Sequence, residues 1–332
     1  MLYRDAGVDI DAMDKVKHAI GKLARLTRTP AVLSEIGLFG ALYEAPRAAG
    51  SVLVASCDGV GTKLLVARRM ERYDTVGIDI VNHSVNDILT LGARPLFFLD
   101  YIAHSDLAPR RLVEIVAGLS RACRDNGCAL VGGETAMMPG LYRPGDFDLV
   151  GFIVGQALRS RLVDARRLEP GDIAIGLPSS GLHTNGYSLA RRVLLDEARL
   201  DLASRPAGLR GTLGEALLRP HRSYLRAVAP VLPRLKAVAH ITGGGFYDNI
   251  ERLLPPETSC IINRRAWRPP ALFRLIQRLG SVPEPEMYRA FNMGIGMVLF
   301  AAPGKVPALL RRLTGSRIIG RIVRGTFGTA VI

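Results

Sequence analysis

Acidic and amide side chains stand beside glycines at several places in the first half of the chain. Asp58 opens the segment DGVGTK, which ends at Lys63; Asn86 and Asp87 are adjacent; and Glu134 follows two glycines. Carboxylate oxygens are the ligands that Mg²⁺ prefers, and glycines let backbone N–H groups approach a phosphate closely. Asp58, Asp87 and Glu134 are therefore candidates to hold Mg²⁺ beside a nucleotide.

Two further Gly-rich segments lie in the second half of the chain. They are SSGLHTNG at 179–186 and TGGG at 242–245. Hydroxyl groups and closely approaching backbone N–H groups suit an organic phosphate, so these segments are candidates for a phosphorylated substrate. His183 and His240 lie in or beside them. The other four histidines lie outside Gly-rich loops and are expected on the surface or in packing: His18, His83, His104 and His221.

Each of these features also has a purely structural interpretation. A single Asp-Gly or Gly-Gly pair is usually a turn, and Asn86 and Asp87 could cap a helix. His183 and His240 could be hydrogen-bonded scaffolding. Cys57 has no basic neighbour to activate it, so we expect a buried strand residue rather than a nucleophile.

The net charge of +14 is confined to one half of the chain. The first 160 residues carry 18 basic and 18 acidic side chains, whereas the rest carries 26 basic and 12 acidic ones. The basic residues are scattered in pairs, without the basic runs and interleaved aromatic residues typical of a nucleic-acid site. We therefore expect a mostly solvated basic surface in which a few arginines serve an anionic small molecule, and no nucleic-acid partner.

The order of expected elements indicates an α/β protein. Buried strands are expected at 51–56, 75–79, 95–103, 128–135, 148–156 and 173–181, and helices at 12–28, 81–91, 109–126 and 187–199. A polar stretch at 159–172 separates two such units. With 332 residues, the chain is long enough for two domains. No apolar run approaches a membrane span, and four dispersed cysteines without a CxxC pair favour a cytoplasmic protein without a zinc site.

Several common catalytic motifs are absent from the sequence. It contains no GxxxxGK[ST] loop, no GxGxxG, no GxSxG and no HExxH. These absences count against a P-loop nucleotide hydrolase, a dinucleotide dehydrogenase, a serine hydrolase and a zinc protease.

Taken together and in order, eight segments resemble those of the phosphoribosylformylglycinamidine cyclo-ligase family, the aminoimidazole ribonucleotide synthetases of purine biosynthesis. The resemblance covers about residues 3–325. The segments are YRDAGVDIDA (3–12), DGVGTK (58–63), GIDIVNHSVNDI (77–88), GARPLFFLDY (92–101), VGGETAMMPGLY (131–142), SSGLHTNGYSL (179–189), AHITGGGF (239–246) and MYRAFNMGIGM (287–297).

The resemblance implies a fold, an assembly and a reaction. It implies two mixed-sheet α/β domains: 1–165 for ATP, Mg²⁺ and dimerisation, and 166–332 for the substrate phosphate. The N-terminal sheets of a homodimer would pair into a barrel. ATP would phosphorylate the formyl amide oxygen of formylglycinamidine ribonucleotide, and the amidine nitrogen would then close the ring with release of ADP and phosphate.

Motif by motif, the resemblance also implies residue roles. Lys63 and His183 would be catalytic, and Asp58, Asp87 and Glu134 would hold Mg²⁺. The ATP side would comprise Asp58, Gly59, Gly61, Thr62, Lys63, Asn86 and Asp87. The substrate side would comprise Ser180, Gly181, His183, Thr184, Asn185, His240, Thr242, Gly243, Gly244 and Gly245.

Two other functions remain open at this point. A phosphotransferase of the same superfamily, similar to thiamine-monophosphate kinase, would share the Gly-rich loops but lack the segments at 3–12 and 179–189. A basic nucleic-acid-binding protein would be distinguished by tight binding that falls steeply with salt.

Overall fold

The computed structural model describes residues 2, 5, 30–31, 33, 41–44 and 50–332. The helix expected at 12–28 lies outside these residues. Within the described part, no helix combines the length and apolar character that a membrane crossing requires.

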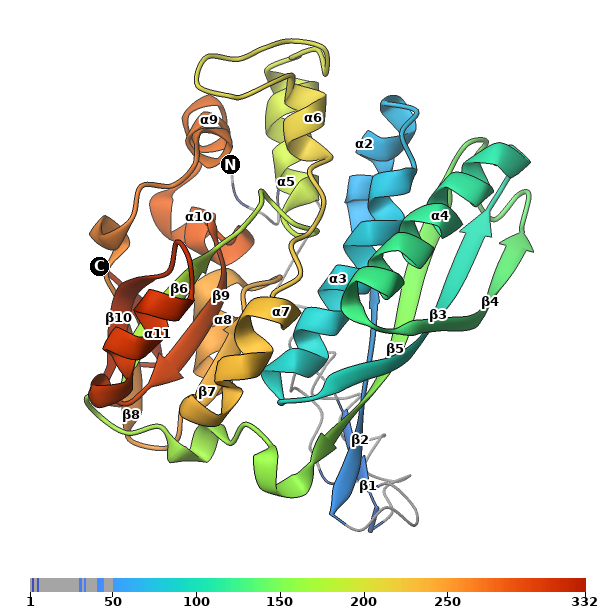
Figure 1. Cartoon of the computed structure of the whole chain (residues 1–332). Helices are drawn as coiled ribbons and strands as arrows, with labels where there is room; N and C mark the ends of the chain where they lie inside the picture. The colour runs from blue at the N-terminus through green and yellow to red at the C-terminus, as the bar shows by residue number, and fades with distance from the viewer. Residues whose placement is uncertain (1, 3–4, 6–29, 32, 34–40, 45–49) are drawn as a thin grey trace.

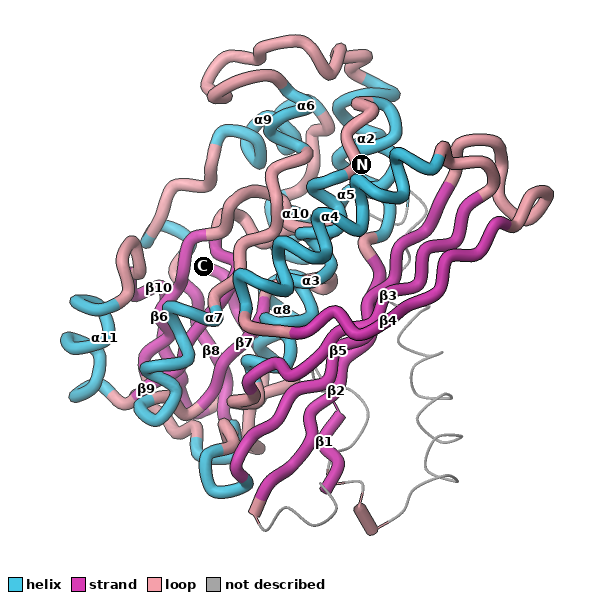
Figure 2. Tube along the Cα trace, turned by 45° about the vertical axis from the view of Figure 1, so that its right-hand side comes forward, coloured by secondary structure: helices cyan, strands magenta, loops and turns pink. Residues whose placement is uncertain are grey.

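A five-stranded mixed sheet organises the first half of the chain, in the order β1-β2-β5-β3-β4. β3 and β4 run parallel, and the other neighbours are antiparallel. α3 and α4 cover one face (Figures 1 and 2). The elements are β1 (Ala41–Glu44), β2 (Ser51–Gly59), α2 (Leu64–Arg69), α3 (Asp74–Thr90), β3 (Arg94–His104), α4 (Pro109–Asn126), β4 (Ala129–Met137) and β5 (Phe147–Leu158).

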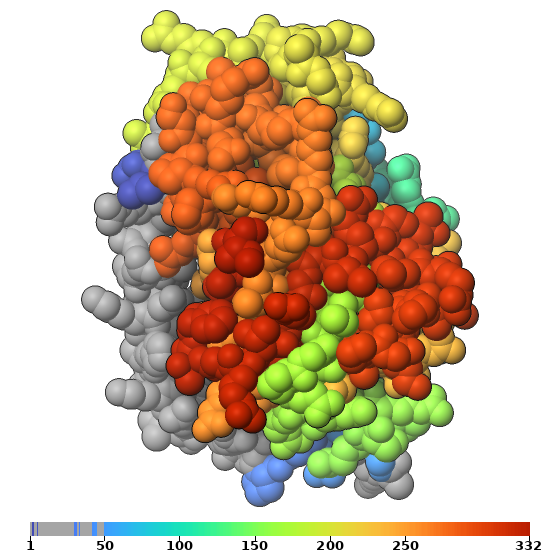
Figure 3. All heavy atoms as spheres, turned by 90° about the vertical axis from the view of Figure 1, so that its left-hand side faces the viewer, coloured from blue at the N-terminus to red at the C-terminus, as the bar shows by residue number. Residues whose placement is uncertain are grey.

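A six-stranded mixed sheet organises the second half, in the order β11-β8-β10-β6-β9-β7. Segments near the C-terminus of the chain form most of the face shown in Figure 3. The strands are β6 (Ile173–Pro178), β7 (Ala237–His240), β8 (Thr258–Ile262), β9 (Ile295–Ala301), β10 (Arg317–Arg324) and β11 (Thr329–Val331). The helices are α5 (Tyr187–Arg191), α6 (Leu213–Leu217), α7 (Leu225–Val228), α8 (Gly245–Glu251), α9 (Ala271–Leu279), α10 (Glu284–Ala290) and α11 (Val306–Arg312). Two mixed sheets with helices packed on them confirm the expected α/β fold class.

α3 is the element that connects the two halves, and it corrects one expectation. The strand expected at 75–79 is the first part of this single helix. One side of α3 packs on β2, β3 and β5, and the other contacts β7 and α7 of the second half (Figure 1). Both faces of α3 are buried, and its polar face meets the second half of the chain instead of water. The β-branched residues near its start then resemble a strand.

The face of the first sheet opposite α3 carries exposed apolar side chains. The ladder places Cys57, Phe152 and Leu99 side by side on this face, with Tyr101 one pair further along. Phe152 is 41% exposed and Tyr101 37% exposed. Cys57, expected to be buried, is exposed. Its strand β2 is paired on both sides, but Cys57 points away from the helix layer.

Two glycines allow α3 and α4 to cross in close contact. A Cβ atom added to Gly77 would lie 2.2 Å from the carbonyl oxygen of Ile115, and one added to Gly118 would lie 2.0 Å from that of Asp74. Real Cβ atoms do not approach backbone that closely. The helix pair therefore depends on glycine at both positions.

We expect Gly77→Ala and Gly118→Ala each to lower the free energy of unfolding by about 1–3 kcal/mol, because the helices have to move apart. Gly304→Ala is the matched control, since a Cβ there meets no atom within 4 Å. Urea unfolding of the three variants measures the effect. Equal stability of all three would contradict the close crossing.

Candidate functional site

The candidate site begins on the face of α3 that meets the second half of the chain. Its polar residues recur three and four positions apart, the spacing of one helix face. They are Asp79, Asn82, His83, Asn86 and Asp87. All but Asn82 are buried. A polar helix face buried in this way requires partners on the opposing surface.

Lys63 and Asp79 form an ion pair at the centre of this boundary, with both side chains fully buried. Lys63 Nζ lies 2.8 and 2.7 Å from the two carboxylate oxygens of Asp79. Burial lowers the pKa of Lys63 and raises the pKa of Asp79. The attraction between the two charges acts against both shifts. The charged pair therefore depends on both members.

The remaining hydrogens of Lys63 hold two loops of the second half. Nζ donates to the carbonyl oxygens of His183, at 3.1 Å, and Arg219, at 2.9 Å. With Asp79, these acceptors use all three N–H bonds of the ammonium group. Protein acceptors therefore take all three N–H bonds of Lys63 in this structure, and the expected catalytic role of Lys63 at the ATP phosphates stays a prediction.

Two asparagines of α3 bind the backbone of the loop that leads into α7. Asn86 donates to the carbonyl oxygen of Arg222 at 2.8 Å and accepts from the backbone N–H of Tyr224 at 2.9 Å. Asn82 donates to the carbonyl oxygen of His221 at 2.7 Å. Asn86, expected on the ATP side, thus connects the two halves.

Asp58 and Asp87 converge on one imidazole nitrogen. His83 Nε2 lies 2.8 Å from Asp58 Oδ2 and 3.3 Å from Asp87 Oδ2. Burial opposes a charge on His83, but the two carboxylates hold its pKa well above the usual value. Burial would likewise raise the pKa of Asp87, yet His83 and His240 lower it to about 2.

The convergence of Asp58 and Asp87 fits a divalent cation, since both offer the carboxylate oxygens that hard cations prefer. The side chain of Asp58 is 46% exposed, whereas that of Asp87 is 6% exposed. A cation would therefore enter the site from the solvent side, past Asp58.

Glu134 lies apart from these two carboxylates within the chain. The ladder runs from Asp58 through Gly151 and Asp100 to Gly133, so two strands separate β2 from β4. At about 4.8 Å per strand, the separation is about 14 Å. Glu134 also pairs with Tyr101 and shares the open face, whereas Asp58 points to the helix face. One chain does not bring the three expected metal ligands together.

Four histidines gather where α3 meets the second half. The rings of His183 and His221 are stacked with centroids 3.9 Å apart, and His221 Nε2 lies 3.0 Å from His240 Nε2. Burial lowers the pKa of all three, which favours neutral rings. His83 and His221 were expected on the surface or in packing; instead they hydrogen-bond with the expected site residues His240, Asp87 and Thr184.

The expected catalytic residue His183 is fully buried. Its Nε2 accepts from the backbone N–H of Ser180 at 3.2 Å, and its Nδ1 has no hydrogen-bond partner among the residues that the structure describes. Its backbone is left-handed, with φ +65°. In this arrangement, His183 shapes the 179–186 loop, and its ring does not reach solvent.

The accessible rim of the site is made of backbone and small side chains. On one side, Gly61 and Thr62 are exposed; on the other, Gly243 is exposed and Asn185 is half-buried. Thr62 Oγ1 lies 3.2 Å from Ser188 Oγ, just beyond the 179–186 loop. The expected ATP loop and the expected substrate loop therefore lie next to each other.

The TGGG segment contains one position with room for a side chain. Gly244 and Gly245 have φ +85° and +60°, and a Cβ at Gly245 would lie 1.8 Å from the carbonyl oxygen of Tyr288. At Gly243, a Cβ would meet only Asn185 Oδ1, at 3.4 Å. Gly244 and Gly245 are required by the turn itself, whereas Gly243 is free to face a ligand.

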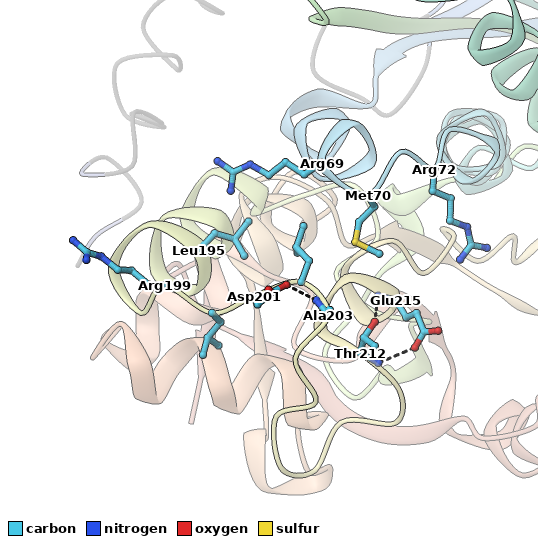
Figure 4. Close-up of a pocket in the computed structure, with 11 residues that line it drawn as sticks. Arg69, Met70, Arg72, Leu195, Arg199, Asp201, Ala203, Thr212 and Glu215 are labelled. Atoms are coloured by element: carbon cyan, nitrogen blue, oxygen red, sulfur yellow. Dashed lines mark hydrogen bonds between the residues drawn. The ribbon is translucent and has the colours of Figure 1, made fainter.

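A separate hollow lies beside α2 and the 199–212 loop. It has a volume of about 720 Å³, and its lining includes Arg69, Arg72 and Arg199. Figure 4 shows the three guanidinium groups well separated, with Arg69 and Arg199 extending to one side and Arg72 lying on the other. They do not converge on an anion, so this hollow is not the candidate site.

The comparisons with known proteins identify the family. Models of the AIR synthase related protein N-terminal and C-terminal domains match residues 40–157 and 169–332. The phosphoribosylformylglycinamidine cyclo-ligase of Thermoanaerobacter pseudethanolicus is 46% identical over 333 residues, covering 99% of each chain. That of Anaeromyxobacter sp. (strain Fw109-5) is 48% identical over 335 residues, covering 98% of this chain and 97% of the relative. The chain belongs to this family.

Full-length similarity at this level gives the chain the activity of the family. It is an aminoimidazole ribonucleotide synthetase of purine biosynthesis, a ligase that uses ATP and acts on formylglycinamidine ribonucleotide. The resemblance drawn from the motifs is confirmed. The kinase-like and nucleic-acid-binding alternatives are set aside.

Solved structures of more distant proteins share the fold. "AaThiL complexed with AMPPCP and TMP" has a TM-score of 0.68 at 18% identity, covering 94% of this chain and 92% of that one. Hydrogenase maturation protein HypE in complex with ATP has a TM-score of 0.61 at 17% identity, covering 92% and 88%. At such identities, the likeness extends to the fold alone.

The buried ion pair gives a test of how the boundary is held. We expect Lys63→Met to lower the free energy of unfolding by about 3–5 kcal/mol, because Asp79 is left buried without its counter-charge. The double variant Lys63→Met/Asp79→Leu removes both charges and should regain most of this loss. Denaturant unfolding at one pH measures both. A single variant as stable as the unsubstituted protein would contradict the assigned role of Lys63.

Proposed function

We propose that ring closure takes place along the rim between the Gly59–Thr62 loop and the loops at 179–186 and 242–245. One observation carries this proposal. A residue expected on the ATP side contacts a residue expected on the ribonucleotide side, although the two are far apart in sequence. Asp87 Oδ1 lies 2.8 Å from His240 Nδ1. In this proposal, residues 1–165 serve ATP and Mg²⁺, and residues 166–332 serve the ribonucleotide.

On the ATP side, we propose that Asp58 and Asp87 hold Mg²⁺ and that the loop Gly59–Thr62 meets the phosphates. Gly61 and Thr62 are exposed there and present backbone N–H groups and a hydroxyl. Lys63 holds this loop against the second half through His183 and Arg219.

On the ribonucleotide side, we propose that the backbone around Gly243 and the side chain of Asn185 meet the ribose phosphate. Arg219 and Arg222 are exposed beside the 179–186 loop and donate to the carbonyl oxygens of Ser180 and Pro178. Their charge attracts a phosphate dianion. The basic character of the second half then serves the substrate.

ATP with Mg²⁺ supplies the phosphoryl group that turns the amide oxygen into a leaving group. The chain contributes position and exclusion of water. The Asp87–His240 contact fixes the metal-side carboxylate relative to the phosphate-side loop, which sets the separation of the two substrates. Since His183, His221 and His240 are buried, this layer closes the base of the rim to solvent.

Two substitutions on opposite sides of the rim test this division and act as controls for each other. We expect Asp58→Asn to lower kcat by about 10²-fold and to raise the Mg²⁺ requirement. Gly243→Ala should raise KM for the ribonucleotide about tenfold, which is about 1.4 kcal/mol of binding, and leave KM for ATP unchanged. Steady-state ADP release with each substrate varied measures both. The proposed division fails if Gly243→Ala changes only KM for ATP.

We further propose that the chain is a cytoplasmic homodimer that pairs the open faces of the first sheet. Phe152 and Tyr101 give this face an exposed apolar surface. Burying such side chains against a second copy is favourable. Glu134 lies on the same face, so it would face the second copy, whereas Asp58 points to the helix face of its own sheet.

Phe152→Asp should therefore convert a dimer of twice 35.9 kDa into a monomer and reduce activity. Phe327→Asp is the control, because Phe327 is similarly exposed at 54% but lies in the second half of the chain. Light scattering coupled to size exclusion measures the mass. In the unsubstituted protein, the dimer would cover Cys57, which lies beside Phe152. A thiol reagent should therefore modify it slowly. A fully active monomer would rule out the proposed assembly.

A further inference from the structure

Five side chains form a closed ring of hydrogen bonds at the domain boundary. Asp87 Oδ1 meets His240 Nδ1 at 2.8 Å, and His240 Nε2 meets His221 Nε2 at 3.0 Å. His221 Nδ1 meets Thr184 Oγ1 at 3.4 Å, which meets His83 Nδ1 at 2.8 Å. His83 Nε2 returns to Asp87 Oδ2 at 3.3 Å.

The chemistry of the groups fixes the direction of each bond in the ring. The carboxylate of Asp87 only accepts, so His240 Nδ1 carries a hydrogen. Burial lowers the pKa of His240, and in the neutral ring Nε2 accepts. His221 must then donate from Nε2 and accept at Nδ1. The acceptor at Nδ1 requires the hydroxyl hydrogen of Thr184.

The other arm of the ring completes the same pattern. Because the hydroxyl of Thr184 gives its hydrogen to His221, it accepts from His83 Nδ1. His83 Nε2 also donates, since it faces the carboxylates of Asp58 and Asp87. Each bond therefore has one donor and one acceptor, and reversing His221 would place two donors or two acceptors face to face.

The ring crosses the domain boundary twice, and no member has ready access to water. His83 and Asp87 belong to α3, whereas Thr184, His221 and His240 belong to the second half. All five are at most 8% exposed. A broken bond is not replaced by a bond to bulk solvent, so each lost partner leaves a buried polar atom unpaired.

The cluster of His183, His221 and His240 does not have the geometry of a metal site. Metal ligation requires imidazole lone pairs to converge in the ring planes. The planes of His183 and His221 are inclined by only 21° and stacked, so their lone pairs run side by side. Both nitrogens of His221 and of His240 also have hydrogen-bond partners.

We propose that His221 is a positioning residue whose imidazole sets the direction of the ring and thereby holds Thr184 of the substrate loop against Asp87 of the metal side. Its backbone is fixed independently: the N–H donates to Asp79 at 2.6 Å, and the carbonyl accepts from Asn82. The side chain alone is therefore available to orient Thr184. The functional consequence rests on the proposed assignment of the 179–186 loop to the ribonucleotide.

Imidazole nitrogen NMR tests the ring directly in the unsubstituted protein without substrate. The chain has only six histidines, so each signal can be assigned by substitution. His221 should be the neutral tautomer with hydrogen on Nε2, and His240 the neutral tautomer with hydrogen on Nδ1. Hydrogen on Nδ1 of His221, or a cationic His221, would overturn the proposal.

Three substitutions separate the two bonds of His221. His221→Gln can still donate toward His240, His221→Asn can still accept from Thr184, and His221→Phe keeps the stack on His183 and loses both bonds. We expect kcat to fall by about 10- to 100-fold in the Phe variant and less in the other two, with KM for ATP changed less than threefold.

His104→Asn is the matched control. His104 is 2% exposed, accepts one backbone hydrogen bond from Leu107 and lies outside the ring. It should leave kcat within twofold. A Phe variant with unchanged kcat would overturn the positioning role. An error in the substrate assignment would instead appear in the kinetics of Gly243→Ala and leave the imidazole signals unchanged, so the two failures are distinguishable.

Discussion

The buried ion pair of Lys63 and Asp79 constrains the rest of the boundary. Two charges removed from water are stable only when each finds its partner and the remaining hydrogens find acceptors. Lys63 meets this requirement by binding the carbonyl oxygens of His183 and Arg219, and Asp79 by accepting from the backbone of His221. The loops of the second half are thus placed on α3 by the need to satisfy one ammonium and one carboxylate.

That placement explains why the polar face of α3 is buried rather than solvated. With the loops fixed at His183 and His221, the side chains of Asn82 and Asn86 reach backbone carbonyl oxygens of the second half. In the same way, His83 meets Thr184, and Asp87 meets His240. The ring is therefore a consequence of the same docking. A change that moves Lys63 should disturb the ring even though Lys63 is not a member of it.

The extent to which the sequence predicts the structure differs between local and long-range features. α4 begins at Pro109 and ends before Gly127, as its pattern predicts, because the proline at the start and the left-handed glycine at the end act locally. The polar spacing from Asp79 to Asp87 also marked a helix face. It was obscured because Thr75–Asp79 resembles a strand. No local signal marks His221, whose partners lie on α3, β7 and the 179–186 loop. The exposure of Cys57 likewise depends on which sheet face the helices cover.

The division of charge along the chain acquires a physical meaning in this arrangement. The arginines that flank the 179–186 loop remain exposed, where they attract an anion through long-range electrostatics. The carboxylates face them across the boundary, and neutral imidazoles occupy the buried layer between. Beneath the exposed rim, the buried charged groups lie in pairs, Lys63 with Asp79 and His83 with Asp87, which avoids unpaired buried charge. This arrangement also leaves a site in which a phosphorylated amide would face amidine nitrogen rather than bulk water. The proposed chemistry therefore requires the two halves to be held closely together, and the ion pair and the hydrogen-bonded ring supply that connection.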